Sequence, residues 1–212
     1  MNLGGLAARH AHAADRTGRA DGNERLTAAT GAVLLVLFAA EGLTILSIHR
    51  LLTLHFFFGM LLVGPAVLKT CSTGYRFARY YLGDRAYRRK GAPTPLLRLL
   101  GPCVVLTTLG VLGSGVALAF AGRGNGPWLF LHKASFVLWF CVMTVHVLAY
   151  VPRLPRLLSA DLPGRAASRA RERLAGRGVR WTLLTLSLAA GLVLAAATVH
   201  RVSGWTGTFT GG

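Results

Sequence analysis

Apolar runs close to twenty residues long recur along this chain, and they constrain its fold more than any other feature. The hydrocarbon core of a bilayer is about 30 Å thick, and a helix needs roughly 20 residues to cross it. The runs span residues 26–48, 51–68, 96–121, 128–151 and 181–200. Hydrophobic residues make up 53% of the chain and charged residues only 15%, a low charge content for a soluble domain. The sequence therefore predicts an all-α integral membrane helical bundle of about five transmembrane helices.

The charged residues lie mostly between these runs, and their distribution predicts the orientation. The net charge of +17 is by itself compatible with nucleic-acid binding. However, the N-terminal tail and two long loops hold most of the arginines, whereas the two short turns carry Arg50 and Arg123. Basic segments of this kind stay in the cytoplasm and attract anionic lipid. We therefore expect membrane lipid rather than nucleic acid as the partner, and a plasma-membrane location with the N-terminus cytoplasmic and the C-terminus external.

This pattern divides the chain into five parts. Residues 1–25 are polar and lack the apolar core of a signal peptide, so we expect a disordered cytoplasmic tail. Residues 26–151 hold four spans, which form two hairpins. Residues 152–180 form a basic cytoplasmic loop, whose second half is a candidate interfacial helix. Residues 181–200 make the fifth span, and residues 201–212 an external tail.

Histidines inside two spans are the candidates for function, because an ionisable side chain in an apolar helix is costly. His55 and His132 each lie about four residues into a span that starts at the outer face, so both are expected roughly 6 Å below that surface. His146 follows His132 by fourteen residues, about 21 Å along the same side of the helix. The segments around His55 and His132 also align as a short repeat, in which Lys69 matches His146.

Two imidazoles at one level on separate helices suit a haem iron held from both sides. The pair His132 and His146, together with the aligned His55, resembles the four-helix membrane cytochrome b families. These are the haem b subunits of formate dehydrogenase and hydrogenase type and their small bacterial relatives. The resemblance covers roughly residues 26–151. It implies a four-helix core in which paired helices supply histidine ligands to one or two haems, which exchange electrons with quinone or with a partner protein.

The candidate ligands follow from this resemblance. His55 and His132 are the expected axial ligands of one haem b near the outer face. A second haem at His146 needs another ligand, because Lys69 at the end of its span is expected to reach the membrane surface. Otherwise, His146 is a polar residue bonded to a neighbouring carbonyl. Glu41, the acid inside the first span, is expected near His55 as an acceptor for an imidazole N–H, as a proton relay, or as a protonated group bonded to backbone.

Three basic residues near the outer surface complete the set of candidate site residues. Arg50, Arg123 and Lys133 lie near the outer surface, either as partners of haem propionates or as interfacial anchors.

The sequence contains no CxxC pair and no nucleotide-binding, hydrolase or metalloprotease motif. We therefore expect an electron-transfer protein or a non-catalytic subunit of an oxidoreductase, which carries electrons from quinone or an internal donor to an outer acceptor. The alternative is a small transporter or scaffold in which the histidines and Glu41 line a polar path.

Overall fold

The computed structural model of the chain describes residues 3–89, 95–122, 126–150 and 177–206, and the structural statements below concern these residues. The elements are α1 (Leu3–Ile45), α2 (Ile48–Tyr81), α3 (Arg85–Arg89), α4 (Pro95–Ala121), α5 (Gly126–Tyr150), α8 (Arg177–Thr198), the 3₁₀ helix η2 (Val199–Val202) and α9 (Ser203–Thr206). The described part of the chain contains no strand. The predicted all-α architecture is therefore confirmed.

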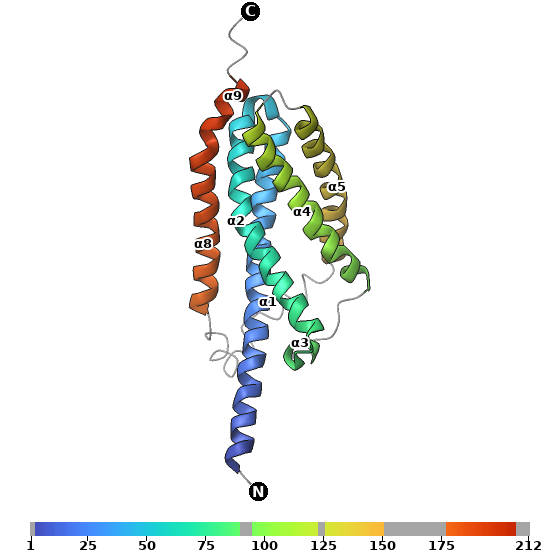
Figure 1. Ribbon diagram of the computed structural model, residues 1–212, viewed down its shortest axis with the longest axis vertical. Coiled ribbons are helices and arrows are strands. Elements are labelled where there is room, and N and C mark those ends of the chain that lie inside the picture. The colour runs from blue at the N-terminus through green and yellow to red at the C-terminus, as the bar shows by residue number, and fades with distance from the viewer. Residues whose placement is uncertain (1–2, 90–94, 123–125, 151–176, 207–212) are drawn as a thin grey trace, which may run out of the picture.

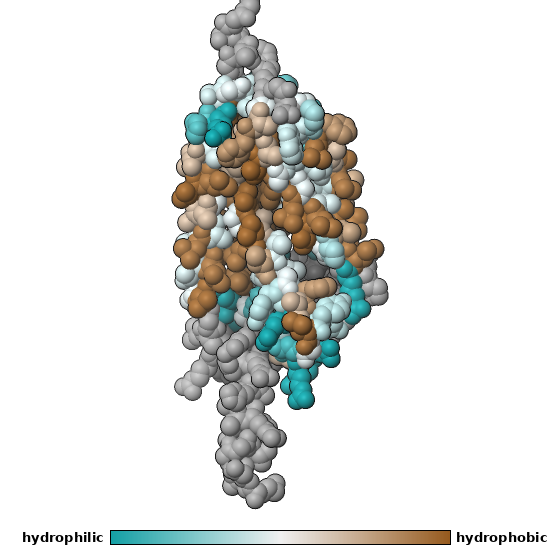
Figure 2. Space-filling view, viewed as in Figure 1, coloured by the Kyte–Doolittle hydropathy of each residue, from teal (hydrophilic) through white to brown (hydrophobic). Residues whose placement is uncertain are grey.

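Five of these helices are long and apolar enough to cross a membrane, as the sequence predicted. The candidate spans are Gly22–Ile45, Ile48–Tyr81, Arg98–Ala121, Gly126–Ala149 and Gly178–Trp205. The helices lie along the long axis of the molecule (Figure 1). Figure 2 shows a broad apolar belt around the middle of the visible face, with polar residues gathered near α3 and near α9. A surface of this kind suits contact with lipid.

The helices form two hairpins and one added helix. α1 pairs with α2, α4 pairs with α5, and α8 packs along α2 on the side away from α5 (Figure 1). The two hairpins meet mainly where α4 contacts α2, whereas α5 has no extensive backbone contact with either helix of the first hairpin within the described residues. Side chains therefore fill the space between α5 and the first hairpin, and this space holds the candidate site.

Two glycines bring α8 against α2. Gly64 of α2 faces the backbone of Ser187, and Gly191 of α8 faces the backbone of Leu61. A Cβ atom at either glycine would overlap the carbonyl oxygen of the facing residue. Only a residue without a side chain lets the two helices meet backbone to backbone, which is a common way for membrane helices to pack.

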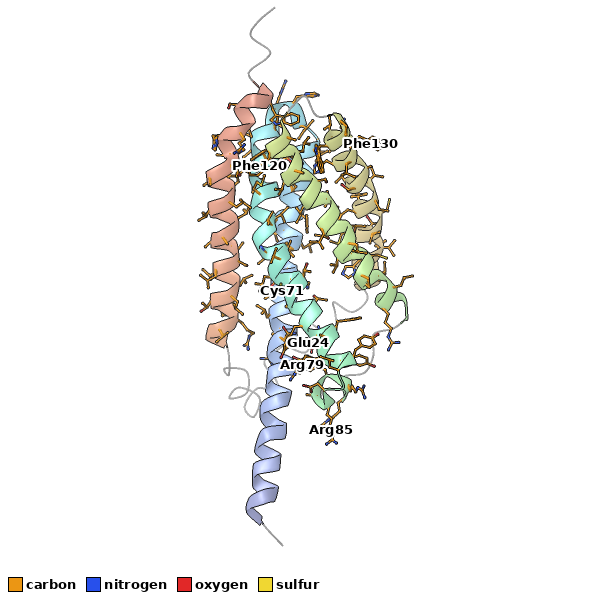
Figure 3. All side chains as sticks on the ribbon, in the orientation of Figure 1. Glu24, Cys71, Arg79, Arg85, Phe120 and Phe130 are labelled. Carbon is orange, nitrogen blue, oxygen red and sulfur yellow. The ribbon has the colours of Figure 1, made fainter. Side chains whose placement is uncertain are left out.

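The two ends of the bundle differ in chemistry. Arg79 and Arg85 lie at one end, and Phe120 and Phe130 lie toward the other (Figure 3). We call the first the arginine end, which contains α3 and the end of α2. We call the second the turn end, where α2 and α5 begin. At the arginine end, Arg79 Nη2 forms an ion pair of 2.8 Å with Asp84 Oδ2.

Several predicted boundaries were wrong. The segment from Leu3 to residue 25 is helical and continuous with the first span, not a disordered tail. Its Ala20 is buried against Ala86 and Tyr87 of α3, so contacts at the arginine end support the longer helix. The first turn lies at residues 46–47, and the predicted connection at residues 49–50 belongs to α2. α2 also continues to Tyr81, because apolar composition limits a membrane span but does not limit a helix.

Other predictions lie partly outside the described residues. Of the predicted basic loop at 152–180, only residues 177–180 are described, and they begin α8. Arg123 and residues 207–212 of the predicted external tail also lie outside. The last candidate span continues past residue 200 to Trp205, through η2 and α9.

Candidate functional site

His55 and His132 meet between the two hairpins, near the turn end of the bundle. His55 lies about two turns into α2, and His132 lies about two turns into α5. Their ring centroids are 6.3 Å apart, and the ring planes are inclined at 70°. The two imidazoles thus reach one level, as their positions in the sequence predicted.

The His55 ring is held through its Nδ1 atom by two residues of α1. Thr44 Oγ1 and Glu41 Oε1 each lie 2.9 Å from Nδ1. The Thr44 hydroxyl donates its own proton to the backbone carbonyl of Glu41, so its oxygen is an acceptor toward the imidazole. This network places the ring proton on Nδ1. The lone pair of Nε2 is then available to bind a metal ion.

The His132 ring has an equivalent arrangement built from hydroxyl groups. Ser114 Oγ of α4 lies 3.2 Å from His132 Nδ1 and 3.0 Å from Ser135 Oγ. Ser114 donates to the backbone carbonyl of Val111, so its oxygen accepts the proton of Nδ1. In the tautomer with the ring proton on Nδ1, Nε2 of His132 is the nitrogen left for a metal ion, as in His55.

The spacing of the two rings matches that of imidazoles on opposite sides of one metal ion. A metal–imidazole bond is about 2 Å long and the ring centre lies roughly 1 Å beyond the nitrogen, so opposed rings have centres roughly 6 Å apart. The observed separation is 6.3 Å. Metal-binding histidines usually donate their second ring N–H to an oxygen acceptor, and both rings have such an acceptor. The pair therefore has a ring spacing that two histidine ligands of one metal ion would have.

Glycines make room for the His132 ring and for the Glu41 carboxylate. A Cβ atom at Gly115 would lie 3.0 Å from Cε1 of His132, so this ring lies directly against the backbone of α4. A Cβ atom at Gly59 would lie 3.3 Å from Glu41 Oε1, so the carboxylate lies against α2. Larger residues at these positions would displace His132 or Glu41.

Glu41 lies inside the site beside His55 and is partly buried. Its side chain is 14% exposed and that of His55 is 22% exposed. Glu41 Oε2 is buried and has no hydrogen-bond partner among the described residues, so the carboxylate is directed mainly at His55. The depth of Glu41 in the first span predicted this neighbour correctly.

His146 lies apart from the pair, beyond a layer of aromatic side chains. Trp139 falls midway between His132 and His146 on α5, and its ring lies 4.6 Å from the ring of Phe38 on α1. The indole Nε1 of Trp139 donates to Thr108 Oγ1 at 3.0 Å. His146 is therefore not part of the site formed by His55 and His132.

Lys69 is held between α1 and α2 instead of extending past a helix end. Its ammonium group donates to the backbone carbonyl of Thr27 and lies over Gly31, where a Cβ atom would be 2.8 Å from Nζ. Lys69 therefore lies in the interface between α1 and α2. The physical reason is that α2 continues to Tyr81, so no helix end is close enough for the side chain to extend past it.

Of the three predicted cations, Arg50 and Lys133 are exposed, and Arg123 lies outside the described residues. A further cation, Arg201 of η2, lies with its guanidinium 4.3 Å from the centroid of the Phe120 ring. Sequence reasoning missed Arg201 and the hydroxyl partners Thr44, Ser114 and Ser135. Isolated hydroxyl residues in apolar helices have no distinctive spacing, so only the packing identified them.

Comparison with protein-family models, with curated proteins and with solved structures finds no match for this chain.

Proposed function

We propose that this chain is a membrane electron carrier that binds one haem b between α2 and α5, with His55 and His132 as the axial ligands. The observation that supports the proposal is the proximity of the two imidazoles, whose ring centroids lie 6.3 Å apart. Each ring is held by an oxygen acceptor at Nδ1, which leaves Nε2 for the iron. When bound, a haem supplies a one-electron iron centre.

A porphyrin, rather than a bare metal ion, explains the small number of protein ligands. Within the described residues there is no group of three or more His, Cys, Asp or Glu that could hold a metal ion. A site with two protein nitrogens needs a cofactor to supply the remaining ligands, and porphyrin supplies four. The limited backbone contact between α5 and the first hairpin is consistent with a flat group inserted there.

Two histidine ligands also favour electron transfer over catalysis. Catalytic metal sites keep an open position for water or substrate, whereas two axial histidines would fill both positions. The chain's own residues would then orient the ligands: Glu41 and Thr44 hold His55, and Ser114 holds His132. A carboxylate on the second nitrogen of a ligating imidazole increases its basicity.

The position of the site suggests the direction of electron transfer. The pair lies near the turn end, and the positive-inside rule places the arginine end in the cytoplasm of the plasma membrane. We therefore propose that the chain passes electrons to an acceptor at the outer face, from quinone or a donor within the membrane. Arg50, Lys133, Arg123 and Arg201 would supply cations for the haem propionates.

The alternative is a transporter or scaffold with a polar path through the bundle. Glu41, His55 and His132 lie near one end of the bundle, and Lys69 and His146 lie nearer the other. The ring contact of Phe38 with Trp139 lies between the two groups. An aromatic layer across the path is unfavourable for a continuous polar route, so electron transfer is the better-supported function.

The test is the absorption spectrum of the purified full-length chain expressed with ample haem. We expect one haem per chain, a Soret band, and an α band on reduction. His55→Ala and His132→Ala should both lose the bound haem, and added imidazole should partly restore it because the free ligand can fill the cavity. His49→Ala is the matched control, since His49 is exposed at the start of α2 and its loss should change nothing. Retention of haem in both cavity variants would overturn the ligand assignment.

A further inference from the structure

Two His-Arg pairs that are far apart in the sequence lie together at the turn end of the bundle. His49 and Arg50 lie in the first turn of α2, and His200 and Arg201 belong to η2. Figure 1 shows the start of α2 and the short helix that follows η2 at the same end of the molecule. All four side chains are exposed. We call these four residues the basic face.

The contact between α8 and α2 places the two pairs at one level. α8 and α2 run antiparallel (Figure 1), and Gly191 of α8 faces the backbone of Leu61 of α2. Arg201 follows Gly191 by ten positions, and Arg50 precedes Leu61 by eleven positions. Both separations correspond to roughly 15 Å of helix, and η2 itself contacts α2. The two arginines therefore lie at nearly the same height on neighbouring elements.

The positive charge at this end extends toward the second hairpin. The guanidinium of Arg201 lies 4.3 Å from the centroid of the Phe120 ring on α4, a cation–π contact. Lys133 of α5 is also exposed. It follows His132, whose ring centroid lies 6.3 Å from that of His55. The basic face is therefore at the same end of the bundle as the proposed haem site.

The elements of this end carry almost no negative charge. The sequence has no Asp or Glu in residues 42–83, 85–160 or 173–212, which include the whole of α2, α4, α5, α8, η2 and α9. Glu41 of α1 is directed at His55. A haem would bring two propionates, which leaves at least two of the four cations named for them above without a carboxylate. The turn end would therefore stay positive with the haem bound.

The membrane topology does not explain this charge. Arginine and lysine favour the cytoplasmic side of a membrane, whereas the proposed orientation puts the basic face outside. Arg50 and Arg201 therefore act against that orientation, and another interaction is needed to account for them. A surface of one charge attracts partners of the opposite charge and guides their approach.

We propose that the basic face is the docking surface for an acidic soluble protein that accepts electrons from the haem. This inference rests on the proposed function and names its outer partner. Arginine binds carboxylates through paired N–H groups and is common in protein interfaces. Arg50 precedes His55 by five positions, which is about 8 Å along α2, so a protein docked here would lie close to the iron. The acceptor would gain one electron as the iron passes from ferrous to ferric.

The test is photo-crosslinking from a position next to the basic face. The substitution Leu46→p-benzoylphenylalanine places the crosslinker in the turn before α2, where Leu46 is 80% exposed and carries no charge. The purified full-length chain, in nanodiscs of phosphatidylcholine, is mixed with a labelled oligoglutamate peptide. We expect saturable crosslinking that weakens as salt is added. An oligoglutamine peptide of equal length should give background only, and equal crosslinking of the two peptides would contradict the proposal.

Paired charge variants show whether the basic face is responsible. Arg50→Gln combined with Arg201→Gln should raise the peptide concentration for half-maximal crosslinking about two- to tenfold, as expected for the loss of two exposed charge pairs. Arg85→Gln combined with Arg89→Gln is the matched control, since it removes the same charge from exposed positions on α3. It should leave crosslinking at position 46 unchanged. Equal effects of the two pairs would overturn the proposal.

A lipid arm tests the other source of negative charge. The crosslinking is repeated in nanodiscs that also contain phosphatidylglycerol, and the products are identified by mass spectrometry. We expect oligoglutamate to remain the main product at position 46. Crosslinks to phosphatidylglycerol that excess peptide does not displace would assign the basic face to lipid headgroups and would overturn the protein partner.

The haem content of the same samples separates this proposal from the proposed function, because the crosslinking itself needs no haem. His55→Ala should lose the haem and still crosslink oligoglutamate normally. A chain that binds haem but shows no selective crosslinking would reject the docking surface and leave the proposed function intact. Selective crosslinking in a chain that binds no haem would reject the proposed function, and the electron-accepting role of the partner with it.

Discussion

The two histidines of the candidate site have different partners, and this difference should affect a bound iron. His55 faces both a carboxylate and a hydroxyl group, Glu41 and Thr44, whereas His132 faces the hydroxyl of Ser114. A negative charge next to a ligand stabilises the more positive, oxidised iron. Glu41 should therefore lower the reduction potential, and the serine hydroxyls should mainly set the orientation of the His132 ring.

Glu41→Gln tests the contribution of that charge. The amide can still accept a hydrogen bond from His55, so we expect the haem to stay bound and its midpoint potential to rise, as measured by spectroelectrochemical titration. Glu41→Ala also removes the acceptor and should weaken haem binding about 10–100-fold. Glu24→Gln, an exposed acid on the same helix, is the control. An unchanged or lower potential in Glu41→Gln would contradict the assignment.

Gly115→Ala tests the packing of the His132 ring. The added methyl group would lie 3.0 Å from Cε1 of the ring, which is tighter than an ordinary carbon contact, so we expect the ring to move and haem binding to weaken. Gly113→Ala on the same helix is the control, because a Cβ atom there meets nothing within 4 Å. Haem titration of the two variants measures the difference. Equal affinities would show that the site has room beside His132.

At the scale of helices, the bundle combines one tight contact and one looser one. α8 meets α2 backbone to backbone at Gly64 and Gly191, whereas α5 is joined to the first hairpin largely through side chains such as Phe38 and Trp139. The tight contact anchors the added helix on one side of α2. The looser one lies on the other side of α2, where the side chains of His55 and His132 meet.

Gly64→Ala and Gly191→Ala should separate α8 from α2. In both variants the new methyl group overlaps a backbone carbonyl oxygen, and overpacking typically costs about 1–3 kcal/mol. We therefore expect the free energy of unfolding in detergent to fall by that amount in each variant. Gly74→Ala, also on α2 but with nothing within 4 Å, should have no such effect. If the stability of all three variants were equal, the close contact of α8 and α2 would not form in the membrane.

At the scale of the whole molecule, crossing of a membrane by all five candidate spans would place the two ends of the chain on opposite sides. The arginine end should be cytoplasmic, because basic residues are retained there. In that orientation, the proposed haem site would lie near the outer face.

Fusion of reporter proteins to each end tests this arrangement. A fluorescent protein that folds only in the cytoplasm should be bright when fused to the N-terminus and dark when fused to the C-terminus. A phosphatase that is active only outside should give the opposite result. Bright fusions at both ends would mean an even number of spans, and the reversed pattern would place the haem site at the inner face.

The sequence by itself determined the spans and the level of the site residues. Apolar length is a local property, and the regular rise of a helix converts residue numbers into depth, which is why His55, His132 and Glu41 were placed at one level. Only the tertiary structure decided which neighbours each side chain meets. These spans are apolar on most sides, so their periodicity does not define the rotation of each helix. The positions of Thr44, Ser114 and Lys69, and the contact between Gly64 and Gly191, therefore depend on how the helices pack together.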